Sequence, residues 1–241
     1  MSETALELFR RGVEQLQLPL SKLQYEQLLC YRDELLDWNT RMNLTAITDA
    51  EEVLFKHFLD SLSLLQAFRS PDAEVLDIGT GAGFPGLVLK IAYPRWRVTL
   101  LEATGKKVTF LRHVINTLAV QGVEAIQGRA EELAHQRGYR GRYDLVTARA
   151  VSALPTLLEY AAPFCRMDGT MIFPKKGELA EEMAQARRAA PLVGVTFVSA
   201  QLITLAGLDD GRRLLIWRQQ KLCPAQYPRS GAAMTKKPLG A

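Results

Sequence analysis

The stretch EVLDIGTGAGFPG, residues 74–86, decides how this chain is expected to fold. It predicts a short apolar strand that ends in an acid, Asp77, and runs into a glycine turn. A helix is expected to start at Pro85 and to continue through residues 86–92, because proline suits the first helical position. Glycines lack a Cβ, so the backbone can turn tightly and lie close to a ligand. The stretch therefore predicts a nucleotide-sized pocket at the carboxyl end of a first strand.

The spacing of the glycines narrows the class of ligand. Gly79, Gly81 and Gly83 alternate, whereas a dinucleotide fingerprint needs a small residue where Phe84 stands, and a P-loop needs a Gly-Lys-Ser/Thr sequence. A Gly-x-Gly-x-Gly sequence after Asp-Ile resembles motif I of class I S-adenosylmethionine-dependent methyltransferases. An ordinary turn between a strand and a helix is the alternative interpretation. Phe84 also disfavours a nicotinamide oxidoreductase.

After Pro71, predicted strands and helices alternate. The strands are expected at 75–78, 98–101, 124–127, 145–147 and 170–173, and the helices at 86–92, 106–118, 131–136 and 154–164. Such alternation indicates a parallel sheet with helices on both faces. Three further strands, at 195–198, 201–205 and 214–217, have no long helix between them, and Asp209-Asp210-Gly211 is a turn signal. We therefore predict an α/β fold of the class I methyltransferase type, with a mainly parallel seven-stranded sheet and an antiparallel last strand.

The first seventy residues are predicted to be helical. An amphipathic pattern runs from Leu6 toward Pro19 and resumes after Ser21. Thr48-Asp49-Ala50-Glu51 has the spacing of a capping box and is expected to open a further helix. The sequence thus predicts an N-terminal helical cap at 1–70, a cofactor-binding core at 71–217 and a basic C-terminal tail at 218–241.

Composition limits the class of protein. The chain has 241 residues, 48% of them apolar, and no apolar run approaches the ~20 residues of a membrane span. The start, Met1-Ser2-Glu3-Thr4-Ala5, is unlike a secretory signal. Three scattered cysteines form no disulfide framework or zinc pattern. We expect a monomeric cytoplasmic protein with no membrane partner.

Charge is distributed unevenly along the chain. The formal net charge is +4, but the end of the chain from Trp217 has no acid and five cations: Arg218, Lys221, Arg229, Lys236 and Lys237. A basic tail beside a pocket suggests a polyanionic partner. A solvated, partly disordered tail is the alternative.

Acids at the predicted sheet edge are candidates for cofactor binding. Glu102 ends the second strand about 20 residues after the glycine loop, where an acid bonds ribose hydroxyls. Asp77 is expected either to orient the loop or to face the ammonium group of a methionine. Glu131 follows the third strand, where an acid and the backbone would reach the amino group of adenine. It is also an ordinary first-turn helix residue.

The fourth strand is followed by Thr147-Ala148-Arg149-Ala150, where methyltransferases of exocyclic amines usually show Asn/Asp-Pro-Pro-Tyr/Phe. Cys165 is expected inside a helix, as part of the core, so a cysteine nucleophile is not indicated. A guanine N7 would explain the missing base, because its lone pair attacks a sulfonium methyl without losing a proton. Other acceptors that need little acid–base help are also compatible.

Cations are expected beside the same pocket. Arg149 would place a permanent charge at its mouth, and Lys175 and Lys176 follow the fifth strand. Together with Arg229, Lys236 and Lys237 they favour a nucleic-acid partner over a merely solvated surface.

The histidines indicate a functional role less clearly than the acids and cations do. His57 stands among apolar helix residues, where a structural role is favoured over a substrate contact. No pair of histidines has metal-ligand spacing, so no metal site is predicted.

With these residues identified, the chain resembles the RsmG (GidB) family, which consists of guanine-N7 methyltransferases of small-subunit ribosomal RNA. The motifs that carry the resemblance span roughly residues 20–217 and are Trp38-Asn39, Asn43-Leu44-Thr45, His57-Phe58-Leu59-Asp60-Ser61-Leu62, Asp77–Gly86, Gly105-Lys106-Lys107, Phe110-Leu111, Ala130-Glu131, Arg149-Ala150 and Lys176-Gly177. The tail looks like that of a branch of the family with a C-terminal extension.

The resemblance implies a function and a set of site residues. It implies methyl transfer from S-adenosylmethionine to N7 of one guanine in 16S rRNA, free or in the small ribosomal subunit. It implies cofactor contacts at Gly79, Phe84, Ala130, Glu131 and Arg149, and is compatible with contacts at Glu102, Ala103 and Thr104. From the glycine spacing and the strand end, we expect Gly79, Gly81 and Glu102 to hold the cofactor. Family members without this tail argue against a catalytic role for Arg229 or Lys236. A class I methyltransferase of proteins or small molecules and a non-catalytic ribosome-binding protein are the rival hypotheses.

Overall fold

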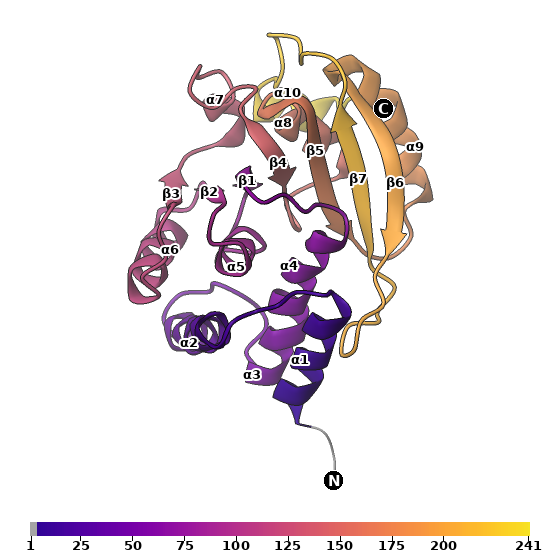
Figure 1. Cartoon of the computed structure of the whole chain (residues 1–241). Coiled ribbons are helices and arrows are strands. Elements are labelled where there is room, and N and C mark those ends of the chain that lie inside the picture. Colours follow the sequence, from indigo (N-terminus) through magenta and orange to yellow (C-terminus); the bar gives the residue numbers. More distant parts are fainter. Residues whose placement is uncertain (1–3) are drawn as a thin grey trace.

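The computed structural model describes residues 4–241. The expected start at Met1-Ser2-Glu3 lies outside the described residues. Seven strands form one sheet in the order β3-β2-β1-β4-β5-β7-β6 (Figure 1). The strands are β1 (Glu74–Ile78), β2 (Arg97–Glu102), β3 (Val123–Gln127), β4 (Tyr143–Thr147), β5 (Cys165–Lys175), β6 (Val195–Leu202) and β7 (Arg213–Gln219).

Strand direction confirms the predicted fold class. Strands β1 to β5 pair in parallel, and β7 pairs antiparallel with both β5 and β6. Because β1 ends at a point where the chain order reverses, between β2 and β4, its carboxyl end opens into the crevice where α/β sheets bind ligands.

Helices cover both faces of the sheet. They are α5 (Gly86–Ala92), α6 (Gly105–Thr117), α7 (Ala130–Leu133), α8 (Leu154–Ala161), α9 (Ala180–Ala189) and α10 (Gly231–Lys236). Alternate strand residues point to two separate cores, since Val75 belongs to one and Leu76 to the other. The first core contains α5, α6 and the N-terminal helices, and the second contains α7, α8 and α9.

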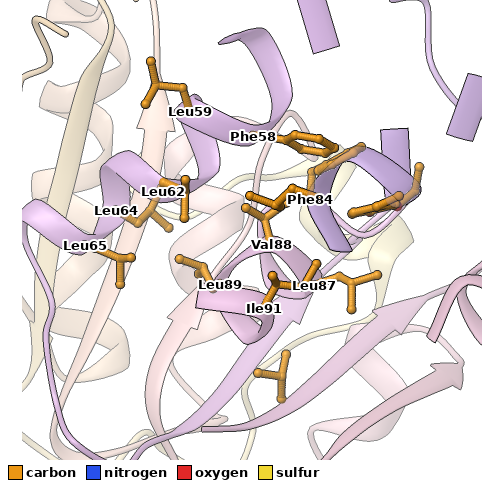
Figure 2. Close-up of a cluster of buried hydrophobic side chains, with 14 of the residues drawn as sticks. Phe58, Leu59, Leu62, Leu64, Leu65, Phe84, Leu87, Val88, Leu89 and Ile91 are labelled. Atoms are coloured by element: carbon orange, nitrogen blue, oxygen red, sulfur yellow. The ribbon is translucent and has the colours of Figure 1, made fainter. Parts of the chain in front are cut away.

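The N-terminal helices are built onto the first core. They are α1 (Ala5–Gln15), α2 (Lys22–Asn39), α3 (Ala50–Val53), a π-helical stretch (Leu54–Leu59), α4 (Asp60–Ser63) and a 3₁₀ turn (Leu64–Gln66). Phe58 and Leu62 lie against Phe84 and Val88 in one buried cluster (Figure 2). The cap therefore shares a continuous core with the loop and helix that follow β1.

The predicted starts of α5 and α3 each lie one residue too early. Pro85 occupies the N-cap position of α5, with φ −89° and ψ −9°, and the helix begins at Gly86. Asp49, and not Thr48, caps α3, because its carboxylate accepts hydrogen bonds from the backbone N–H groups of Glu51 and Glu52.

Three predictions after β4 are also corrected. Helix α8 ends at Ala161, because Pro163 cannot continue a helix, so Cys165 opens β5 although it is buried as expected. Helix α9 was not predicted, although its alanines, glutamates and arginines favour helix. The two strands expected at 195–198 and 201–205 form the single strand β6, which a register shift near Phe197 interrupts.

The predicted division of the chain stays a prediction. Strand β7 runs to Gln219, so the sheet extends two residues into the expected tail. Beyond it, Tyr227 and Leu239 are buried in the second core. Among residues 4–241, no helix is both long and apolar enough to cross a membrane.

Candidate active site

The buried side chain of Asp77 stabilises the loop after β1 by hydrogen bonds. Its Oδ2 accepts hydrogen bonds from Thr80 Oγ1 at 2.6 Å and from the N–H of Gly86 at 2.8 Å. Gly79 and Gly81 have φ angles of +64° and +62°, a region that disfavours side chains. Asp77 is fully buried, and burial raises its pKa to about 7. One carboxylate therefore joins the strand, the loop and the start of α5.

Glu102 also binds the loop after β1, through a backbone N–H group of that loop. Its Oε2 accepts the N–H of Gly81 at 3.0 Å, and its Oε1 accepts the N–H of Thr104 at 2.8 Å. Each carboxylate oxygen has two lone pairs, so one acceptor position on each oxygen remains for a ligand hydroxyl. The glycine loop and the β2–α6 turn are thus fixed by one side chain that can still accept hydrogen bonds.

A cavity of about 120 Å³ opens beside these residues at the ends of β1, β2 and β3. It is lined by the predicted residues Gly79, Ala103, Ala130 and Glu131, together with Ile78, Leu101, Gly128, Arg129, Val151 and Tyr160. A mostly apolar lining with one carboxylate, Glu131, suits a heterocycle that carries an amino group.

Val151 partly fills the space over the glycine loop. A Cβ placed on Gly79 would lie 2.7 Å from Cγ2 of Val151. The preceding residue, Ala150, has φ +56°, which is unusual for a residue with a side chain. The loop after β4 therefore touches the small cavity through Val151, two residues beyond Arg149.

A larger cavity of about 620 Å³ lies next to it, between the cap and the ends of β4 and β5. Five cations and two carboxylates line it along with apolar and neutral groups: Lys56, Arg149, Lys175, Lys176 and Arg212, Asp60 and Asp210, and Ile47, His57, Ala150 and Pro174. The excess of positive charge suits an anionic substrate.

Arg149 is locked to the cap. Its Nη1 donates to Asp60 Oδ2 at 2.7 Å and to the carbonyl of Lys56 at 3.0 Å, and its Nη2 donates to His57 Nδ1 at 2.9 Å. The guanidinium also lies over the ring of Phe84, 5.2 Å from its centroid. Arg149 therefore links the loop after β4 to the cap.

Asp60 pairs with a second arginine. Its carboxylate is buried and forms an ion pair with Arg212, which comes from the turn between β6 and β7. Burial of one carboxylate between two guanidinium groups satisfies its charge. The cap, the β4 loop and the last hairpin are thus joined at one acid.

His57 is a structural member of this network. Its Nε2 lies 2.8 Å from Thr45 Oγ1, and its ring stacks on Phe84 at 4.3 Å. Burial and the neighbouring Arg149 lower the pKa of His57 to about 3, so the imidazole is neutral. Because Nδ1 accepts from Arg149, the proton lies on Nε2, and His57 has no free nitrogen to act as a base.

Phe84 lies in an aromatic stack between the loop and the cap. Its ring is 4% exposed and stacks on Tyr31 and His57. It lines neither cavity. The cofactor contact expected at Phe84 stays a prediction, and the ring's observed contacts are with the cap.

The predicted RNA-binding residues fall into two groups. Lys175 and Lys176 line the larger cavity with Arg149. Lys175 donates to Glu182 at 2.7 Å and to the carbonyl of Ser152 at 2.9 Å, whereas Lys176 pairs with Asp210 at 3.1 Å.

The tail cations lie elsewhere. Lys236 and Lys237 are exposed at the end of α10. Arg229 pairs with the buried Glu159 on α8 at 2.7 Å. The structure does not bring these three residues to the larger cavity, so their expected contact with RNA stays a prediction.

Several residues that line these cavities were not predicted as site residues, among them Asp60, Arg212, Val151 and Tyr160. The sequence could have indicated Asp60, since an acid within an apolar helix segment needs a partner. It could not have indicated Arg212, because its partner Asp60 is 152 positions earlier in the chain.

Comparison with known families and relatives agrees with this architecture. Residues 24–206 match the family of rRNA small subunit methyltransferase G (GidB). A protein of Dehalococcoides mccartyi, named ribosomal RNA small subunit methyltransferase G, is 45% identical over 95% of this chain and 97% of its own. Proteins of the same name from Roseiflexus and from Alkaliphilus metalliredigens are 42% and 40% identical, over 92% and 96% of this chain and 94% and 98% of their own.

Solved structures show the same fold at low identity. A mutant of MtNAS in complex with S-adenosylmethionine is similar with a TM-score of 0.54 and 15% identity, over 90% of this chain and 78% of that one. A predicted O-methyltransferase from Agrobacterium tumefaciens has a TM-score of 0.51 and 19% identity, over 68% of this chain and 80% of its own. These structures share the fold, whereas the near full-length relatives share the sequence. The chain belongs to the rRNA small subunit methyltransferase G family.

Proposed function

We propose that this chain transfers a methyl group from S-adenosylmethionine to N7 of a specific guanine in 16S rRNA. The observation that carries the proposal is the pair of adjoining cavities at the carboxyl edge of the sheet. One is small and mostly apolar, and the other is large and cationic. The loop after β4 lines both, with Arg149 and Ala150 in the larger cavity and Val151 in the small one.

The residues around the small cavity fit the cofactor. The acceptor positions left on Glu102 suit two ribose hydroxyls, and Ala103, Ala130 and Glu131 suit an adenine ring and its amino group. Gly79 and Gly81 allow the backbone to lie against the ligand. When bound, S-adenosylmethionine supplies an electrophilic methyl group on a sulfonium.

The larger cavity suits an acceptor that needs no base. Among the described residues that line it, the imidazole of His57 has both nitrogens engaged. The two carboxylates are ion-paired, Asp60 with Arg149 and Arg212 and Asp210 with Lys176 and Arg212. In such a transfer the lone pair of guanine N7 would form the bond to the methyl carbon as the carbon–sulfur bond broke toward sulfur. No proton would have to move, so the residues of the cavity would act by aligning the acceptor with the donor.

The cations of the larger cavity support RNA as the substrate. Lys56 and Lys176 have side chains 49% and 60% exposed at its rim, where they can contact phosphates. Phosphate contacts release counterions, so binding of the RNA should weaken steeply with salt. A methyltransferase that acts on proteins or on neutral small molecules is expected to show no such salt-sensitive affinity for RNA.

Further aspects of the proposal concern the setting of the reaction. We propose that the chain acts as a monomer on 16S rRNA or on the small ribosomal subunit, in the cytoplasm where ribosomes form. The computed structure contains both cavities within one chain, which supports activity without a second copy.

Methyl incorporation from labelled S-adenosylmethionine tests the proposal. We expect label in unmethylated 16S rRNA or 30S particles, at a rate that falls with rising salt. Incorporation into ribosomal protein, or binding of RNA that salt does not weaken, would contradict it. Parallel assays with free RNA and with particles decide which of the two is the substrate.

A further inference from the structure

The end of the chain follows a fixed path over α7 and α8. We call residues 224–236 the C-terminal strap. The guanidinium of Arg140 donates to the carbonyls of Cys223, Pro224 and Tyr227 at 3.0, 2.9 and 2.9 Å. The last part of the strap is α10 (Gly231–Lys236), which lies close to α7 and α8 (Figure 1). Its start is thus anchored through backbone carbonyls.

Arg229 fastens the middle of the strap to a buried acid. Its N–H and Nε donate to Oε1 of Glu159 at 2.9 and 2.8 Å, and its Nη2 donates to Oε2 at 2.7 Å. The Glu159 side chain is 0% exposed, whereas that of Arg229 is 26% exposed. Within residues 4–241, Arg229 provides every hydrogen bond given to this carboxylate. If Arg229 left, Glu159 would be buried and unpaired, which is strongly unfavourable.

Two residues beyond this pair, the strap contacts the wall of the small cavity. A Cβ placed on Gly231 would lie 2.9 Å from Oε1 of Glu131 and 3.9 Å from the hydroxyl of Tyr160. Both of these residues line the small cavity. Glu159, the partner of Arg229, directly precedes Tyr160 on α8. The strap therefore packs against Glu131 and Tyr160, two residues that line the cavity proposed to bind adenine.

We propose that the strap is part of the cofactor site and that Arg229 is a positioning residue for S-adenosylmethionine rather than a contact for RNA. This inference rests on the function proposed above. Arg229 holds the Ser230–Gly231 turn in place, and the turn fixes the carboxylate of Glu131 and the ring of Tyr160. The exposed cations Lys236 and Lys237 remain available for RNA.

The geometry separates this role from an RNA-binding one. Two of the five guanidinium N–H groups, on Nε and Nη2, donate to Glu159. A phosphate could take this bidentate edge of Arg229 only by displacing the buried acid. Loss of Arg229 should therefore change the affinity for the cofactor and leave the affinity for RNA unchanged.

Calorimetric titration with S-adenosylmethionine and S-adenosylhomocysteine tests this inference on the full chain. We expect Arg229→Gln to weaken both ligands by about tenfold, equivalent to about 1.4 kcal/mol, and to raise the KM for the cofactor with little change in kcat. Arg229→Lys should recover part of the affinity. The matched control is Lys221→Gln, which removes one charge from an exposed position outside the strap and should leave cofactor affinity unchanged.

A second variant keeps the test decisive if Arg229→Gln does not fold. Gly231→Ala introduces a Cβ that pushes on Glu131, and we expect cofactor affinity to fall by severalfold while the midpoint of thermal unfolding stays near that of the wild type. Ala232→Ser, on an exposed neighbour, is its control. Wild-type affinity for the cofactor in Arg229→Gln, or in Gly231→Ala where Arg229→Gln does not fold, would overturn the inference, as would a loss of RNA affinity alone. Failure of the wild-type chain to bind S-adenosylmethionine would instead overturn the proposed function.

Discussion

Asp77 shows how one buried side chain can set the pH dependence of stability. In the unfolded chain, an aspartate has a pKa of about 3.9, whereas burial raises the pKa of folded Asp77 to about 7. Between these values the folded state binds more protons than the unfolded state. This residue's contribution to the free energy of unfolding therefore falls as the pH rises from about 4 to about 7, by up to about 1.4 kcal/mol per pH unit.

Asp77→Asn should remove this contribution. The amide is neutral and its oxygen can still accept from Gly86 and Thr80. We expect the stability of the wild type relative to the variant to decrease from pH 4.5 to pH 6.5 in urea denaturation of the ligand-free chain. A difference that stays constant over this range would show that Asp77 is ionised in the fold.

Arg149 is the second residue whose removal has a defined consequence. Arg149→Ala leaves Asp60 buried with Arg212 as its remaining arginine partner, and we expect a loss of about 3 kcal/mol in the free energy of unfolding. Asp60→Asn in the same chain should recover part of this loss, because the buried charge is then absent. Additive effects in the double-mutant cycle would contradict the coupling between these residues.

At the scale of elements, helix α5 is positioned by close approach to the sheet. A Cβ on Gly86 would meet Leu100 Cδ2 and would lie 2.8 Å from Cβ of Asp77. We expect Gly86→Ala to destabilise the fold by about 1–3 kcal/mol through overpacking. Gly138→Ala is the control, since nothing lies within 4 Å of its Cβ position. Equal melting temperatures of the two variants would contradict this packing argument.

Some helices and strands could be predicted from the sequence and others could not. The strands and the Gly79–Gly83 turn were predictable because local apolar runs and glycine spacing determine them. Cys165 was placed in a helix because its apolar surroundings suit either a helix or a strand, and Pro163 decides between them. Glu102 was found because it follows a strand in phase with the glycine loop.

Pairs that are distant in sequence could not be predicted. Arg149 was placed beside a pocket but not against Asp60, 89 positions earlier. Arg229 was expected to contact RNA on its charge alone, whereas Glu159, buried 70 positions earlier, accepts three hydrogen bonds from it. Charge predicts a partner, but only the tertiary fold determines which one.

For the whole molecule, the cap and the core depend on each other. The buried cluster that joins Phe58 and Leu62 to Phe84 and Val88 spans the predicted boundary near residue 70 (Figure 2). Removal of residues 1–70 would expose this apolar surface and leave Arg149 without Asp60. We expect the shortened chain to lose cooperative unfolding and to bind a hydrophobic dye. Wild-type cooperativity of residues 71–241 would show that the core folds alone.

The proposed function requires the carboxyl edge of the sheet to align a methyl donor with guanine N7, without a general base. The most direct measurement incubates the chain with S-adenosylmethionine and unmethylated 30S particles, then treats the RNA with borohydride and aniline, which cleave at 7-methylguanine. We predict one new cleavage site, at a single guanine of 16S rRNA. Methylated RNA that resists this cleavage, with the label on another base atom or on ribose, would contradict it.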